Sequence, residues 1–256
     1  MRQNPVTVDL FTDSGYSSSM ISNERDTAMI DFHSHILPGI DDGSRSRKMS
    51  LAMIAALAEQ GVDTIVASSH FYASDSSPEL FLARRQEAYE KLISELPAEA
   101  PGIRLGAEIL YYPGISHMEQ LPELCIEGTN ALLLEMPFMR WSRSFIREVL
   151  ELAAGQRYTV ILAHFERYSE PSEVWESLME HGVLMQSNAD YYVPLRTRHQ
   201  ALKLLRDGRI HLLGSDAHNL AERAPHMDEA ARIIRRSCGQ GALDEIDRRG
   251  RELLGI

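Results

Sequence analysis

Seven short apolar runs recur along the chain, and each ends on side chains that can bind a metal ion or a phosphate. The runs span residues 30–35, 64–70, 103–109, 130–136, 159–166, 183–188 and 210–218. Their lengths are typical of buried strands. The polar side chains at or just past their carboxyl-terminal ends are His33, His35, His70, Glu108, Glu135, His164, Asn188, Asp216 and His218.

Helical patterns fill the intervals between these runs. Apolar residues recur at helical spacing over 46–60, and a glycine follows where such a helix should end. Ser76 as a cap, a proline in the first turn and Glu79 three residues on predict a second helix that continues to about Glu95. Further helices are predicted over 143–154, 172–181, 197–207, 226–237 and 242–254.

This alternation of strands and helices predicts an α/β fold with a parallel sheet. Seven strands in a single domain predict a distorted (β/α)7 barrel of the TIM type, whose functional residues gather at the carboxyl-terminal strand ends. A doubly wound open sheet is the alternative, but it places its site at one switch point. We assign the domain to 29–256. Residues 1–28 are interpreted as a flexible polar leader, as an upstream start ahead of Met29, or as a docking tail carrying Tyr16.

Composition narrows the class of protein. A net charge of −11 argues against nucleic acid as a partner. No apolar stretch approaches the roughly 18 residues of a membrane span, so no membrane insertion is expected. Cys125 and Cys238 give no disulfide framework, and a cytoplasmic location is predicted. Neither cysteine precedes an arginine loop of the kind used by cysteine phosphatases, and the glycine-rich loops for nucleoside triphosphates or dinucleotides do not occur.

The strand-end side chains are rich enough for several metal ions. His33 and His35 lie on one face of a strand, and Asp216 and His218 repeat that spacing. The predicted ligands are His33, His35, Asp42, His70, Glu108, Glu135, His164, Asp216 and His218. One zinc ion takes about four ligands, so this set suits two or three ions. Nitrogen and oxygen donors without a thiolate admit manganese, iron, zinc or magnesium.

Two arginines and one amide complete the predicted site. Arg167 and Arg223 lie just past strand ends, and a guanidinium matches phosphate oxygens in a two-point contact. Three divalent ions would bring six positive charges against the four negative charges of the carboxylates. The site would then carry a net positive charge, which suits a phosphate ester. Asn188 offers a neutral amide, so we predict that it orients substrate or a neighbouring ligand. Structural or surface roles are predicted for the remaining histidines, His117, His181, His199, His211 and His226.

Several of these segments occur in the order found in a known family. They are Asp31-Phe32-His33-Ser34-His35, Asp41-Asp42-Gly43, Ser69-His70, Gly106-Ala107-Glu108-Ile109, Glu135, AHFERY at 163–168, SDAHN at 215–219 and Arg223-Ala224-Pro225-His226-Met227. Over about 29–254 the chain resembles the polymerase-and-histidinol-phosphatase (PHP) superfamily. Within it, the chain is similar to the bacterial metal-dependent protein-tyrosine phosphatases of capsule and exopolysaccharide synthesis.

The resemblance implies a (β/α)7 barrel, a three-ion site usually described with Mn²⁺, and phosphotyrosine on a bacterial tyrosine kinase as substrate. It implies three ligand groups, which are His33, His35, Glu108 and Asp216, then Asp42, His70 and His218, then Glu108, Glu135 and His164. Arg167 and Arg223 would bind the phosphate. One departure concerns substrate preference, because Phe71 and Tyr72 follow His70 where some relatives carry basic residues.

Three functions remain open from the sequence. The leading hypothesis is phosphotyrosine hydrolysis by direct attack of a metal-activated hydroxide, with no covalent intermediate. The second keeps the fold and changes the substrate to a small phosphate, such as histidinol phosphate or a sugar phosphate, or to a phosphodiester. The third is a non-catalytic metal-binding module that serves regulation.

Overall fold

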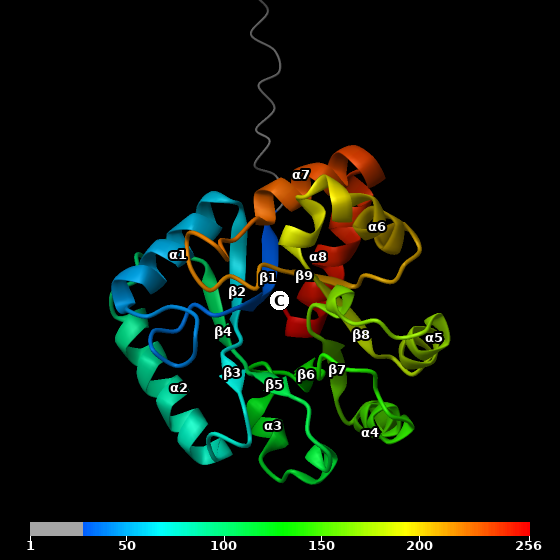
Figure 1. Cartoon of the computed structure of the whole chain (residues 1–256). Coiled ribbons are helices and arrows are strands. Elements are labelled where there is room, and N and C mark those ends of the chain that lie inside the picture. The colour runs from blue at the N-terminus through cyan, green and yellow to red at the C-terminus, as the bar shows by residue number, and fades with distance from the viewer. Residues whose placement is uncertain (1–27) are drawn as a thin grey trace, which may run out of the picture.

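The strands of this protein form a ring that is surrounded by helices (Figure 1). The structure is a computed structural model, and it describes residues 28–256. The strands are β1 (Met29–Ser34), β2 (Val62–Ala67), β3 (His70–Phe71), β4 (Gly102–Leu105), β5 (Glu108–Leu110), β6 (Ala131–Glu135), β7 (Thr159–Leu162), β8 (Leu184–Asn188) and β9 (Leu212–Gly214). Apart from its last residue, the predicted leader, with Tyr16, lies outside the described residues.

The parallel strands close on themselves. One sheet has the order β1-β2-β4 and the other β3-β5-β6-β7-β8-β9. The ring closes where the Asp216 N–H donates to the His33 carbonyl at 2.6 Å and the His35 N–H donates to the Ala217 carbonyl at 3.0 Å. On the other side, the Glu108 N–H reaches the carbonyls of the segment between β2 and β3. The predicted barrel is confirmed, and the open doubly wound sheet is wrong.

Two of the predicted strands are broken in the middle. The run over 64–70 forms β2 and β3, and the run over 103–109 forms β4 and β5. Ser68 lies in the first break, where both its hydroxyl and its backbone N–H bond to the backbone of Ser34 at the end of β1. His70 and Glu108 therefore begin new strands instead of ending the first ones, and they are direct partners in the β3–β5 register.

The helices follow the predicted intervals. They are α1 (Arg47–Glu59), α2 (Pro78–Ile93), α3 (Leu121–Leu124), α4 (Arg143–Ala153), α5 (Ser172–Glu180), α6 (Leu195–Arg206), α7 (Met227–Cys238) and α8 (Gln240–Leu254). Short 3₁₀ helices lie at Ile115–His117, Ala154–Gln156, Phe165–Arg167 and Ala189–Tyr192. Among residues 28–256, no helix is both long and apolar enough to cross a membrane.

Local signals explain where the helix boundaries differ from the prediction. Ser77, not Ser76, caps α2, because Pro78 occupies the first helical position and the Leu80 N–H donates to the Ser77 hydroxyl at 3.3 Å. The same helix ends at Ile93, before the predicted end. Helix α6 begins two residues earlier than predicted, directly after a proline that precedes its first turn. Helix α3 was not predicted, since four residues are too few for a periodic signal.

Two apolar layers hold the barrel together. One fills the space between the strands and the outer helices. The other fills the ring and includes Ile30, Phe32, Leu133 and Ile161, with Leu254 from the end of α8. Figure 1 accordingly shows the C-terminus at the centre of the ring. Because apolar side chains fill the interior at the end covered by α8, the polar strand ends are confined to the opposite rim.

Candidate metal centre

Glu108 is the point on which the predicted ligands converge. Its side chain is fully buried. Its Oε2 lies 2.9 Å from His70 Nδ1, 3.1 Å from His33 Nε2 and 3.3 Å from His35 Nε2, and its Oε1 lies 2.9 Å from His164 Nε2. These imidazoles come from β1 and the residue just after it, from β3 and from the turn after β7. One carboxylate therefore faces four imidazoles, as a bridging ligand between ions would.

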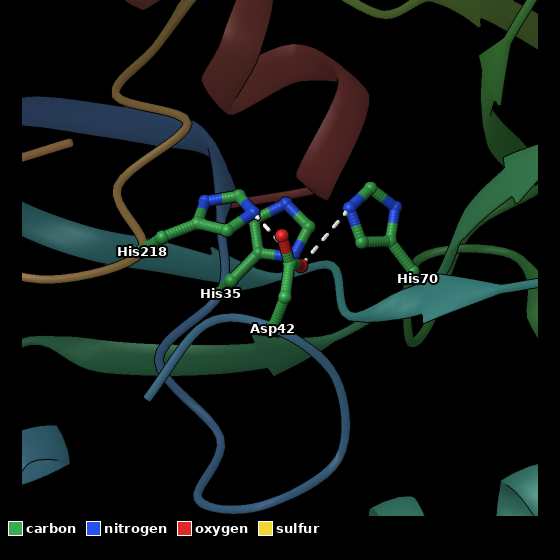
Figure 2. A group of neighbouring side chains, drawn as sticks. All are labelled: His35, Asp42, His70 and His218. Atoms are coloured by element: carbon green, nitrogen blue, oxygen red, sulfur yellow. Dashed lines mark ion pairs between the residues drawn. The ribbon is translucent and has the colours of Figure 1, made fainter. Parts of the chain in front are cut away.

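A second group surrounds Asp42, which lies in the loop after β1. Figure 2 shows Asp42 rising between His35, His70 and His218, whose rings point toward it. Asp42 Oδ1 lies 3.2 Å from His218 Nε2 and 3.5 Å from His70 Nε2. One ligand atom from each of the four residues falls within 4.8 Å of the others. The Asp42 side chain is 66% exposed, so this group opens to solvent, whereas Glu108 lies below it.

Asp216 joins the metal cluster to the predicted phosphate-binding arginines. Its Oδ2 accepts a hydrogen bond from Arg167 at 2.6 Å and one from the Asn188 amide at 2.9 Å, and its Oδ1 accepts one from Arg223 at 2.8 Å. Both Asp216 and His164 have left-handed backbone, with φ values of 52° and 33°. Such a conformation is costly for residues other than glycine and is often found at functional sites.

The spacing of these donors fits metal ions. Two ligands about 2.1 Å from one ion lie roughly 3.0 to 3.4 Å apart at octahedral or tetrahedral angles. His33 Nε2 and His35 Nε2 lie 3.1 Å apart, and both are about that far from Glu108 Oε2. In addition, Glu108 Oε2, His70 Nδ1 and His218 Nε2 are buried without an aligned hydrogen-bond partner among the described residues. Cations would satisfy these atoms, so the residues present fit the predicted metal site.

The charges within the cluster support the ionised form of its carboxylates. Burial alone would raise the pKa of Glu108, but the charge of His33 and a hydrogen bond from the His164 ring hold that pKa well below its usual range. Burial would likewise raise the pKa of Asp41, yet hydrogen bonds from the His35 ring and two backbone N–H groups hold it below its usual value. Both carboxyl groups are therefore anionic in the folded protein.

Two functional residues were missed by the sequence analysis. Asp41 Oδ2 lies 2.8 Å from His35 Nδ1, and Gln186 Oε1 lies 3.0 Å from His33 Nδ1. Each fixes the orientation of an imidazole whose other nitrogen faces the cluster, an arrangement that also sets the tautomer. In the sequence, Asp41 could be noticed only as a second acid beside Asp42, and Gln186 only as a glutamine within an apolar strand.

The structure brings the ligand atoms together in three groups that overlap with the groups that the resemblance implies. It brings together His35, Asp42, His70 and His218, then His33, His35 and Glu108, then His70, Glu108 and Glu135. His35 and His70 thus each belong to two groups. His164 Nε2 lies 3.5 Å from Glu135, as implied. Among the described residues, the other five histidines belong to none of these groups.

Asn188 has the position of an orienting residue. Its amide is buried, donates to Asp216 and accepts a hydrogen bond from Gln186 Nε2 at 2.9 Å. These contacts favour the predicted role toward a neighbouring ligand over direct contact with substrate. Together, a parallel barrel and an imidazole–carboxylate cluster at one rim define a metal-dependent hydrolase of the β/α-barrel class.

Comparison with known proteins identifies the family within this class. Residues 29–252 match the family model described as capsular polysaccharide synthesis, CpsB/CapC. The chain is 30% identical to tyrosine-protein phosphatase CpsB of Streptococcus pneumoniae, over 85% of this chain and 94% of that protein. It is 29% identical to tyrosine-protein phosphatase YwqE of Bacillus subtilis (strain 168), over 82% of this chain and 85% of that protein. The chain belongs to the CpsB/CapC family.

A solved structure agrees with this assignment. A chain from the crystal structures of YwqE and CpsB, described as unique metal-dependent tyrosine phosphatases, superposes with a TM-score of 0.78 at 26% identity. The match covers 89% of this chain and 94% of that one. The family and the fold predicted from the sequence are confirmed.

Proposed function

We propose that this protein is a metal-dependent tyrosine phosphatase of the CpsB type that removes phosphate from phosphotyrosine on a protein. A bacterial tyrosine kinase of capsular or exopolysaccharide synthesis is the proposed partner. The observation that carries the proposal is the convergence of four imidazoles on the buried carboxylate of Glu108. The names of the relatives, tyrosine-protein phosphatases, support the choice of substrate.

The residues proposed to hold the ions are the nine predicted ligands, arranged around Glu108 and Asp42. Manganese is the proposed metal, and iron, zinc or magnesium would also suit nitrogen and oxygen donors. Ions bound in such a cluster supply an activated water and neutralise charge on the phosphoryl oxygens. Asp41 and Gln186 would hold the His35 and His33 rings in the orientation that binding requires.

Arg167 and Arg223 are proposed to bind the phosphate. Each donates to one oxygen of Asp216, and their side chains remain 36% and 37% exposed. A guanidinium carries five N–H donors, so each retains donors for phosphoryl oxygens. Because the two arginines reach Asp216 from the segments that follow β7 and β9, they would hold the phosphate from two sides at the rim of the cluster.

A cysteine nucleophile does not fit this structure. Cys125 is buried, and burial raises the pKa of its thiol to about 11, so the reactive thiolate is scarce at neutral pH. Its thiol instead donates to the Leu121 carbonyl at 3.6 Å. Cys238 lies at the end of α7, and none of the metal-binding groups found among residues 28–256 includes it.

The test is phosphate release from a phosphotyrosyl peptide by the purified protein. Chelation should abolish release and added Mn²⁺ should restore it. A Cys125→Ser/Cys238→Ser double variant should retain activity, whereas Glu108→Gln should lose it. Full activity after chelation, combined with loss in the cysteine variant, would refute the proposal. A higher kcat/KM for histidinol phosphate or a sugar phosphate than for the peptide would instead identify a small-molecule phosphatase.

A further inference from the structure

Two large apolar side chains are exposed beside the metal centre. Phe138 and Met139 lie in the loop between β6 and α4, and each is 64% exposed. They line a cleft of about 490 Å³ together with Arg140, Arg167 and Tyr168. Adjacent exposed apolar residues that line a cleft are typical of a contact surface for a ligand or partner.

The loop that carries Phe138 is fixed on both sides. Before it, the Met136 N–H donates to the Tyr168 hydroxyl at 2.9 Å. After it, the Trp141 N–H donates to Glu170 at 2.8 Å, and the Trp141 indole N–H donates to a carbonyl of the same loop at 3.2 Å. Trp141 itself is buried. The exposure of Phe138 is therefore built into an anchored loop, and its ring is preorganised for contact.

The ring of Phe138 lies next to the predicted metal cluster. Its centroid lies 5.9 Å from the ring of His164, with 22° between the ring planes, and 5.7 Å from the ring of Tyr168. These separations fall in the range of about 4.5–7 Å over which aromatic rings attract. Arg167, proposed to bind phosphate, lines the same cleft. A leaving group attached to that phosphate would therefore meet Phe138 as it leaves the cluster.

We propose that Phe138 selects aryl over alkyl phosphate esters by stacking on the aromatic ring of the leaving group, with Met139 extending the apolar contact. This inference rests on the proposed function, since it assumes that phosphate binds at the cluster. A phosphoserine or a sugar phosphate has no ring to stack, and its polar leaving group gains nothing from an apolar surface. Phe138 is thus a specificity-determining residue of the same site.

The experiment compares two non-hydrolysable probes that differ only in the ring. Binding of phenylphosphonate and of methylphosphonate to the Mn²⁺-loaded full chain is measured by calorimetry. Phe138→Ala should weaken phenylphosphonate about twofold to twelvefold, the size of an aromatic pair interaction, and leave methylphosphonate unchanged. Phe138→Trp should keep the preference. As a control, Ile93→Ala, which removes a 46%-exposed side chain at the end of α2, should leave both affinities unchanged.

The outcomes separate this inference from the proposed function. If phosphotyrosyl peptide is hydrolysed but Phe138→Ala leaves the ratio of the two affinities unchanged, the ring-stacking role is wrong and the phosphatase stands. Equal weakening of both probes would also overturn it, because a general disturbance of the site would be the cause. If the wild type binds neither probe and hydrolyses no peptide, the proposed function itself fails.

Discussion

Replacing Gly250 in α8 by alanine tests the packing that closes the barrel beneath the site. A Cβ atom at this position would lie 2.5 Å from Phe32 Cε2 and 3.2 Å from Ile30 Cδ1. Phe32 is 2% exposed, so its ring cannot move aside into solvent. Overpacking of this kind costs about 1–3 kcal/mol. Alanine also gains about 1 kcal/mol over glycine in helix propensity, so the net change by itself is ambiguous.

Gly241 in the same helix removes that ambiguity. A Cβ atom there would meet nothing within 4 Å, so Gly241→Ala carries the gain in propensity alone. The difference between the two variants isolates the overpacking cost. At about 2–4 °C per kcal/mol for a chain of this size, Gly250→Ala should melt roughly 2–12 °C below Gly241→Ala. Thermal unfolding followed by far-ultraviolet circular dichroism measures this difference. If Gly250→Ala melts with or above Gly241→Ala, the contact between α8 and β1 is not as described.

Three further predictions concern the site and the pH dependence of stability. Asp41→Asn should lower Mn²⁺ affinity or activity about tenfold to a hundredfold, because both Asp41 oxygens accept hydrogen bonds and a neutral amide replaces one of them by a donor, which holds the His35 ring less firmly. Unchanged Mn²⁺ titrations would contradict this. Glu108→Gln should reduce the number of ions bound per chain, measured by elemental analysis. An unchanged number of ions would contradict the proposed bridging role of Glu108. Burial lowers the pKa of His211 to about 4, with a smaller contribution from Arg249. Its neutral ring therefore adds stability above a pH of about 6.5 that is lost as the pH falls toward 4, up to about 3 kcal/mol. In His211→Gln, the free energy of unfolding should fall less steeply between about pH 6.5 and pH 4 than in the wild type. If the free energy of unfolding depends on pH equally in the two proteins, the lowered pKa of His211 is wrong.

The local pattern of the chain was enough to predict the barrel and most of its chemistry. Alternating strand and helix periods require a parallel sheet, and parallel strands gather their carboxyl-terminal ends on one rim. His33, His164 and Asp216 could therefore be grouped while far apart in sequence. Glu135 could be placed on the same rim, because in β6 it follows Ala131 and Leu133 at every second position and these side chains point into the ring.

Tertiary structure decided which side chains meet at that rim. Asp41 and Asp42 are adjacent acids in one loop, yet one bonds to His35 Nδ1 and the other faces His70 and His218. The breaks in two strands, which let His70 and Glu108 begin new ones in register, depend on hydrogen bonds to other strands.

The sequence by itself thus determined the fold, the residue types and the rim on which they lie, because periodicity is a local property of the backbone. Only the folded chain determined that Glu108 faces four imidazoles, that Gln186 orients His33 and that Phe138 is exposed beside the cluster. Those relations depend on loop paths and on contacts between distant segments. They cannot be inferred from residues that are neighbours in the sequence.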